Sequence, residues 1–284
     1  MKKVLWFLKE GFLNFGKALY LLSDELIMCF HSSTFCALFN LRSVFMRWDI
    51  RFKYLTEQKL YEASSSDFRQ NFLNRRQALN AYRVSLSRRS QYMKSVYQLD
   101  RVDLKNGDVV VDCGANVGDL LLYFKSFNIK AHYIGFEPSP SEFRCLMQNA
   151  PDADLHNVGL WNEDSSLNFY VSSDGADSSF IMPKRYDEII KISTKRLDEI
   201  ISPHLLIKLL KLEAEGAEPE AIKGAENILQ NIEFISADLG FERGVSEEST
   251  LAPVVNFLLE RGFVLVNVTA GRVVALFHNK LYIK

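Results

Sequence analysis

The stretch VVVDCGANVGD, residues 109–119, is the part of the sequence that decides the fold. Its three leading valines are β-branched and apolar, which is typical of a strand buried on both faces. Gly114 and Gly118 follow without a break, and Leu120–Leu122 continue as an apolar helical run. A buried strand that passes through a glycine turn directly into a helix predicts the first strand–helix unit of an open parallel sheet.

The same alternation of short apolar strands and helical runs continues along the rest of the chain. It predicts an α/β fold with a doubly wound, mostly parallel sheet and helices on both faces. Helices are expected after the prolines at 138 and 140, and near 219–230 and 250–261. The further strands are expected at residues 133–137, 155–158, 206–212, 234–238, 263–268 and 272–278.

Residues at the carboxyl ends of these strands are the first candidates for a functional site. In open parallel sheets, ligands bind beyond the carboxyl ends of the strands, where the strand order reverses. The candidates at these positions are Asp112, Gly114, Glu137, Asn157, Glu213 and Asp238.

The glycine turn restricts the kind of cofactor. Gly114 permits a sharp turn and a close approach of ligand to backbone, and Gly118 lets the helix pack closely on the sheet. A dinucleotide fingerprint needs a second glycine at the position of Asn116, so NAD and FAD are disfavoured. A phosphate-binding P-loop is excluded, because no Gly-Lys-Ser or Gly-Lys-Thr follows.

Two acids complete the cofactor prediction. Asp112 would repel a phosphate, but it can hold a cationic amine. Glu137 lies 19 residues past Gly118 at the end of the next strand, where an acid accepts hydrogen bonds from a ribose diol. A ligand with an amine and a ribose but no pyrophosphate indicates S-adenosylmethionine.

Five segments together resemble the FkbM-type methyltransferase family. They are VVVDCGANVGD, YIGFEPSP, HNVGLW, the RLDEI segment and LKLEAEGAEPEAIKGAE, within about residues 100–270. The resemblance implies the class I methyltransferase fold, with a Rossmann-like seven-stranded sheet and S-adenosylmethionine as cofactor. It also implies methyl transfer to a hydroxyl oxygen, commonly on a sugar or a glycolipid.

The resemblance also assigns positions. The family's first motif matches Asp112, Gly114, Ala115, Asn116 and Gly118, its ribose acid matches Glu137, and Asn157 ends the strand on the adenine side. The family usually has Asp where this chain has Glu213.

Two interpretations of the catalytic groups remain open. Alignment of donor and acceptor supplies much of the rate of a methyl transfer, but a sugar hydroxyl needs a base or a metal to help. In one interpretation Glu213 or Asp238 is the base, and Lys211 or Arg243 orients the substrate. In the other, Glu213 and Asp238 hold a divalent cation, which prefers oxygen ligands. The first is the favoured prediction.

The near-neutral composition hides two oppositely charged regions. Across 284 residues, 34 Lys and Arg face 35 Asp and Glu, but residues 1–105 hold 18 basic and 9 acidic side chains. We therefore expect a basic N-terminal extension over residues 1–95 and an acidic methyltransferase domain over residues 96–284. Four cysteines without a CxxC pair favour a reducing compartment.

The N-terminal extension is expected to be helical. Residues 1–31 show a narrow polar stripe on an otherwise apolar helix pattern, and Arg69, Arg76 and Arg83 suggest a second amphipathic helix from about residue 67. These helices could contact a homo-oligomer partner or a membrane surface. No signal peptide and no membrane span are predicted. We expect a cytoplasmic protein, with membrane association on the cytoplasmic face as an option.

Three functional classes follow. The first is an S-adenosylmethionine-dependent O-methyltransferase that acts on a small-molecule, glycan or glycolipid hydroxyl, without nucleic acid as a partner. The alternatives are a non-catalytic module with the cofactor fold in a glycan-assembly complex, and a nucleotide-sugar oxidoreductase.

Overall fold

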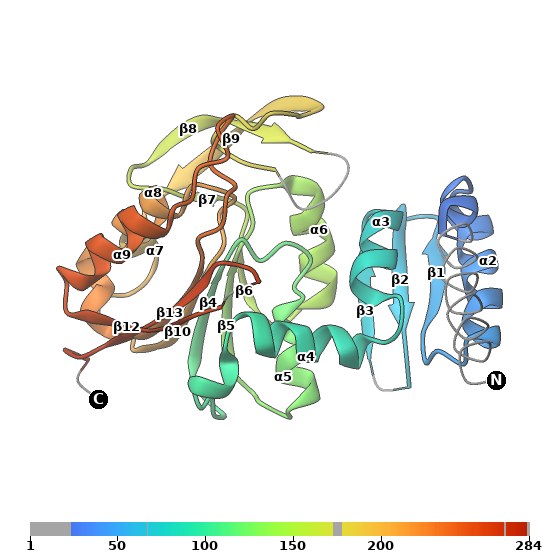
Figure 1. The fold of residues 1–284 in the computed structure, drawn as a ribbon, viewed down its shortest axis with the longest axis horizontal. Coiled ribbons are helices and arrows are strands. Elements are labelled where there is room, and N and C mark those ends of the chain that lie inside the picture. Colours follow the sequence, from blue (N-terminus) through green and yellow to red (C-terminus); the bar gives the residue numbers. More distant parts are fainter. Residues whose placement is uncertain (1–23, 67, 173–177, 270, 283–284) are drawn as a thin grey trace, which may run out of the picture. The chain divides into compact units, whose positions relative to one another are not determined.

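The computed structural model describes residues 24–66, 68–172, 178–269 and 271–282 (Figure 1). The chain divides into two compact units, residues 1–85 and residues 86–284. The helix α4 (Leu86–Val96) belongs to the second unit, because Met93 joins the core formed with Leu120 and Phe124 of α5 (Leu120–Ser126). The sequence instead placed the boundary between residues 95 and 96.

A seven-stranded sheet forms the centre of the second unit. Its order is β12-β13-β11-β10-β4-β5-β6, and the five strands from β11 to β6 run parallel. β13 is antiparallel to both of its neighbours. The doubly wound, mostly parallel sheet predicted from the sequence is therefore confirmed. The strands are β4 (Val109–Cys113), β5 (His132–Phe136), β6 (Asp154–His156), β10 (Ile207–Leu212), β11 (Ile232–Asp238), β12 (Phe263–Val268) and β13 (Val274–Asn279).

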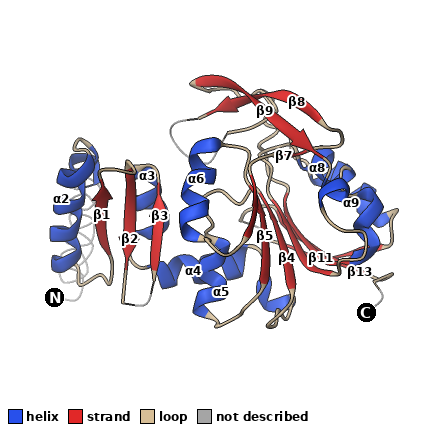
Figure 2. Ribbon diagram, turned by 180° about the vertical axis from the view of Figure 1, so that it is seen from behind, coloured by secondary structure: helices blue, strands red, loops and turns tan. Residues whose placement is uncertain are grey.

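Helices cover both faces of this sheet (Figure 2). Because successive side chains of a strand point to opposite faces, Val110 packs into one apolar core and Val111 into the other. On the Val110 face lie α4, α5, α6 (Pro140–Asn149) and the 3-10 turn η2 (Leu99–Arg101). On the Val111 face lie α7 (Leu197–Ile200), α8 (Glu218–Lys223), η3 (Glu226–Asn231) and α9 (Leu251–Leu259).

The strand order identifies the crevice in which a ligand belongs. From the central strand β4 the chain proceeds outward to β5 and β6, and it then returns to β10 on the other side. In open α/β sheets ligands bind at such a reversal, beyond the carboxyl ends of the strands, which here are β4 and β10.

A small sheet accompanies the main one. It consists of β7 (Gly159–Leu160), β9 (Glu188–Lys195) and β8 (Ser165–Val171), in that order. β8 and β9 pair antiparallel along their whole length, and β7 adds to β9 in parallel. The sequence analysis placed no strands in this region.

The first unit departs from the prediction of a purely helical extension. α2 (Ser32–Phe45) is followed by an antiparallel sheet of three strands and two short helical segments. The strands alternate buried and exposed residues, which lets one face of the sheet pack on the helix. The remaining elements are β1 (Arg51–Leu55), β2 (Leu60–Ser64), β3 (Arg69–Phe72), α3 (Arg75–Gln77) and the π-helix η1 (Ala78–Tyr82).

The predicted amphipathic helix from residue 67 is wrong. Arg69 lies in β3, Arg76 in α3 and Arg83 after η1, so their seven-residue spacing crosses three elements. Burial of Phe72 in a cluster of stacked rings, 5.4 Å from Phe52, outweighs the helical spacing.

The predicted helix of residues 1–31 lies mostly outside the described residues. Of its polar stripe, Asp24 forms ion pairs with Arg42 and Arg83, and His31 precedes α2. Across the described ranges, none of the helices has the length and apolar character required to span a bilayer.

Candidate functional site

The turn after β4 has the backbone that its glycines require. Gly114 and Gly118 have φ of +72° and +87°, and Asn116 between them has φ of +50°. A Cβ atom on Gly114 would lie 1.9 Å from the carbonyl oxygen of Glu213, so only glycine fits there. Asn116 tolerates the left-handed conformation because its side-chain oxygen accepts the N–H of Val117 at 2.8 Å.

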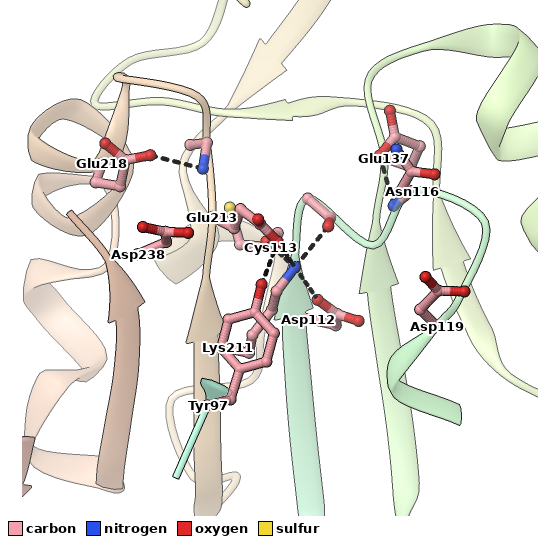
Figure 3. Close-up of polar contacts among 12 residues, drawn as sticks. Tyr97, Asp112, Cys113, Asn116, Asp119, Glu137, Lys211, Glu213, Glu218 and Asp238 are labelled. Carbon is pink, nitrogen blue, oxygen red and sulfur yellow. Dashed lines mark hydrogen bonds and ion pairs between the residues drawn. The ribbon is translucent and has the colours of Figure 1, made fainter. Parts of the chain in front are cut away.

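Glu137 lies at the end of β5, directly beside this turn (Figure 3). One carboxylate oxygen accepts the N–H of Asn116 at 2.8 Å, and the other accepts the N–H of Ser139 at 2.9 Å. Glu137 is 6% exposed. Burial and the nearby Glu142 raise the pKa of Glu137 to about 8, although the two N–H groups act in the opposite direction.

Asn157 braces the backbone next to Glu137. Its amide nitrogen donates to the carbonyl oxygens of Glu137 at 2.8 Å and Pro138 at 3.0 Å. On the same side, the His156 ring stacks on Phe136, with centroids 4.8 Å apart. A contact of Asn157 with an adenine stays a prediction.

Lys211 lies beneath the turn and is 3% exposed. Its amine is 3.0 Å from Asp112 and 2.9 Å from Glu213, and it donates to the carbonyl oxygen of Gly114 at 2.7 Å. Burial alone would lower the pKa of Lys211, but the two carboxylates raise it well above its ordinary value. Figure 3 shows the amine among these groups, where it joins β10 to β4 and to the turn. This geometry suits positioning of the turn better than contact with a substrate.

The carboxylate of Asp112 is buried and binds two side chains of neighbouring strands. It accepts the hydroxyl of Tyr133 at 2.7 Å, pairs with Lys211, and is 1% exposed. Burial raises the pKa of Asp112, and Lys211 opposes this. A direct contact of Asp112 with a cationic amine stays a prediction. The carboxylate would make this contact while it also binds Tyr133 and Lys211.

Glu213 is held by three donors. The hydroxyl of Tyr97 and the amine of Lys211 bind one carboxylate oxygen, and the guanidinium of Arg272 binds the other. Burial would raise the pKa of Glu213, but Lys211 and Arg272 lower it to about 2. A carboxylate with so low a pKa is a weak base at neutral pH.

Arg272 also binds Asp238 through its Nε atom, so the two predicted catalytic acids share one guanidinium. A divalent cation would have to displace it, and within the described residues no group of three or more His, Cys, Asp or Glu could hold a metal ion. Glu213 and Asp238 therefore do not fit a resident cation.

Arg272 itself was missed by the sequence analysis. It lies 59 residues after Glu213, between the last two strands, and no local motif marks it.

The predicted Arg243 and the neighbouring Glu218 bind the loop after β10. Arg243 donates to both carboxylate oxygens of Glu220, each at 2.8 Å, and to the carbonyl oxygen of Gly216 at 2.5 Å. Glu218, at the start of α8, accepts the N–H groups of Ala214 and Gly216 at 2.8 and 3.1 Å. The loop after β10 is thus fixed from both sides.

Residues 178–187 lie against the loops that follow β10 and β11. The hydroxyl of Ser179 donates to the carbonyl oxygen of Glu215 at 2.6 Å, and Lys184 pairs with Glu247 at 2.5 Å. A Cβ atom on Gly244 would lie 3.4 Å from Ile181. These contacts place the segment on the side of the site away from Glu137.

The strand order, with an antiparallel strand between the last two parallel ones, is that of class I S-adenosylmethionine-dependent methyltransferases. The family model described as Methyltransferase FkbM domain matches residues 112–265, more than half of the chain. The chain belongs to the FkbM methyltransferase family, as the resemblance implied.

Several proteins are similar to this chain. 2-O-methyltransferase NoeI of Sinorhizobium fredii is 24% identical over 203 residues, which cover 64% of this chain and 84% of that protein. Hexuronic acid methyltransferase AglP of Haloferax volcanii is 26% identical, covering 51% of this chain and 62% of that protein. Methyltransferase 1 of Beauveria bassiana is 29% identical, and the match covers 42% of this chain and 58% of that protein.

The chain thus spans little more than half the length of some of these relatives. Among solved structures, a precorrin-6y C5,15-methyltransferase from Geobacter metallireducens aligns with a TM-score of 0.39 at 11% identity, over 68% of this chain and 89% of that one.

Proposed function

We propose that this protein is an S-adenosylmethionine-dependent methyltransferase that transfers a methyl group to a hydroxyl oxygen of a sugar, glycan or glycolipid. The observation that carries the proposal is the buried carboxylate of Glu137 next to the left-handed turn at Gly114–Gly118. The FkbM family match supports the reaction class.

The residues around Glu137 fit the cofactor. A carboxylate has about four acceptor positions, and the N–H groups of Asn116 and Ser139 use two of them. The remaining positions suit two ribose hydroxyls. The pKa of about 8 for Glu137 indicates a buried carboxylate short of donors, a deficit that hydroxyl donors would relieve.

Two relatives support a hydroxyl group of a sugar as the acceptor. The name of one specifies 2-O-methylation, and the name of the other specifies hexuronic acid. We extend this chemistry to the present chain as part of the proposal.

In the proposed reaction, the cofactor supplies a methyl group on a sulfonium. Glu137 orients the ribose, and the turn at Gly114–Gly118 brings bare backbone to the cofactor. Lys211 joins the ends of β4 and β10, so that the turn keeps its position. Alignment of this kind supplies much of the rate of a bimolecular displacement.

Calorimetry with S-adenosylhomocysteine tests the proposal. We expect binding by the wild type and at least about 100-fold weaker binding by Glu137→Ala, which removes two charge-assisted hydrogen bonds. Glu188→Ala, which removes an exposed glutamate on β9, should bind as the wild type does. No measurable binding by the wild type would overturn the proposal.

The two alternatives predict different results. A non-catalytic module would bind S-adenosylhomocysteine without transferring a labelled methyl group to any glycan. An oxidoreductase would show saturable nicotinamide binding by fluorescence titration. Contact of the N-terminal helices with a membrane or a second copy stays a prediction, to be checked by vesicle co-sedimentation and by light scattering.

A further inference from the structure

The proposed reaction needs a group that accepts the proton of the acceptor hydroxyl. A general base works best when its pKa lies near the operating pH. Glu213 and Asp238 were the predicted bases, but both are bound to the guanidinium of Arg272. A proton on either carboxylate would break its ion pair with Arg272. For Glu213 the pKa is also lowered to about 2, whereas burial raises the pKa of Asp238 and Arg272 opposes this.

Glu242 is a different kind of carboxylate at the same edge of the sheet. It lies in the loop after β11, four residues past Asp238, and is half-buried. Among the residues that the structure describes, no hydrogen bond or ion pair reaches its carboxyl group. A half-buried carboxylate without a donor is available to a ligand.

The position of Glu242 follows from two glycines. A Cβ atom on Gly240 would lie 3.8 Å from a carboxylate oxygen of Glu242 and 3.4 Å from one of Asp238. Carboxylate oxygens of both residues therefore lie beside the backbone of Gly240, within van der Waals range of the same point.

The second glycine is Gly216, with φ of +93°. Its missing Cβ would lie 3.0 Å from the carbonyl oxygen of Glu242 and 2.6 Å from the Cα of Arg243. The loop after β11 is thereby packed backbone to backbone against the loop after β10, which places Glu242 at the carboxyl edge of the sheet.

The groups around Glu242 keep a proton on it near neutral pH. Burial is the largest cause, and the carboxylates of Asp238, Glu213 and Glu218 add to it, while Arg272 opposes them. Together they raise the pKa of Glu242 to about 7. At this pKa a carboxylate is ionised often enough to accept a proton and basic enough to hold it.

We propose that Glu242 is the general base of the methyl transfer, on a loop packed against Gly216 and beside the Asp238–Arg272–Glu213 cluster. This inference rests on the proposed function. As the acceptor oxygen forms its bond to the methyl carbon, the bond from that carbon to sulfur breaks and its electron pair stays on sulfur. The hydroxyl proton moves to the Glu242 carboxylate, which later releases it to solvent.

The test uses the full chain with methyl-labelled S-adenosylmethionine on an immobilised glycan array, which presents many sugar hydroxyls at once. The best-labelled glycan then serves for kinetics with the wild type, Glu242→Gln and Glu248→Gln. Glu248 is an exposed glutamate of the same loop, so its variant is the matched control. We expect Glu242→Gln to lower kcat at least about 100-fold, and Glu248→Gln to leave it unchanged.

A pH profile separates a base from a merely structural residue. The wild-type kcat should rise with pH through about 7 and then level off, because only ionised Glu242 accepts a proton. The residual rate of Glu242→Gln should lack this rise. Glu242→Gln should bind S-adenosylhomocysteine with an affinity within about twofold of the wild type. This result would show that the variant is folded and that its cofactor site is intact.

Each outcome decides between the two proposals. If the wild type fails to bind S-adenosylhomocysteine, the proposed function fails. If it binds but labels no glycan, the sugar acceptor fails, and the role of Glu242 fails with it. If glycans are labelled and Glu242→Gln keeps the wild-type rate or the same pH profile, only the role of Glu242 is overturned.

Discussion

The two units of the chain are stabilised in different ways. The first has an aromatic core, in which the rings of Phe39 and Phe52 stack with centroids 4.1 Å apart. Over residues 24–66 and 68–85, no Asp, Glu, Lys or Arg is fully buried. The second unit buries several charged residues, among them Asp112, Lys211 and Asp238 at the carboxyl edge of its sheet.

The two kinds of buried residue differ in their effect on stability. Burying apolar rings stabilises a fold without further conditions. Burying charges is unfavourable unless each has a partner, and natural proteins do so mainly where chemistry requires it. Charged side chains at the carboxyl edge of the second unit's sheet thus mark its candidate site, whereas the ion pairs of Asp24 with Arg42 and Arg83 in the first unit are only partly buried. The following predictions test this contrast.

The largest effect is expected for Lys211→Met. The variant leaves Asp112 and Glu213 without the amine that lies 3.0 and 2.9 Å from them. Removal of one partner from a buried ion pair costs about 3–5 kcal/mol. Denaturant unfolding should show this loss, together with weaker binding of S-adenosylhomocysteine, because the amine also holds the carbonyl oxygen of Gly114.

Lys184→Met is the control for this variant. Lys184 pairs with Glu247 on the surface, with about half of its side chain exposed, so its loss should cost under about 1 kcal/mol. Equal stability of the two variants would show that the buried cluster is not an essential part of the fold.

A core substitution in the first unit should lower stability without weakening the binding of S-adenosylhomocysteine. Phe39→Ala removes a fully buried ring that contacts Phe35 and Phe52, at a cost of about 3 kcal/mol. Thermal unfolding should show an earlier transition, while calorimetry should show unchanged affinity for S-adenosylhomocysteine. A loss of affinity comparable to that of Lys211→Met would contradict the separation of core and site.

The smallest effect concerns protons. The free protein holds a proton on Glu137 up to a pH of about 8. Ribose hydroxyls donate hydrogen bonds and therefore favour the ionised form of Glu137. Binding of S-adenosylhomocysteine at pH 7 should then release up to about one proton. The affinity should rise with pH, by up to about tenfold per pH unit, until about pH 8. Calorimetry in buffers of different ionisation enthalpy measures the release, which should vanish in Glu137→Gln.

The same pKa also affects stability without ligand. The unfolded chain ionises Glu137 near its ordinary pKa of 4.5, whereas the folded chain keeps the proton up to about 8. The folded state therefore binds more protons in this interval, and the contribution of Glu137 to stability falls as pH rises from about 4.5 to 8.

The sequence predicted much of the second unit because its signals are local. The βα turn at Gly114–Gly118 and the acid at Glu137 follow from short spacings, and the structure brings them together within hydrogen-bonding distance. Arg272 and Glu242 escaped prediction because their roles depend on partners that only the sheet order brings near. The strands of the first unit were missed because they are short and because Arg69, Arg76 and Arg83, which lie in different elements, have helical spacing by coincidence.

By itself, the sequence determined the fold class, the glycine turn with its neighbouring acid, and the polarity of charge along the chain. Apolar periodicity and glycine positions act through neighbouring residues, so they can be recognised without coordinates. Tertiary structure alone decided which acids are paired and which is not. A carboxylate becomes an ion-pair partner or a candidate base through its burial and the charges around it, and segments distant in sequence supply both.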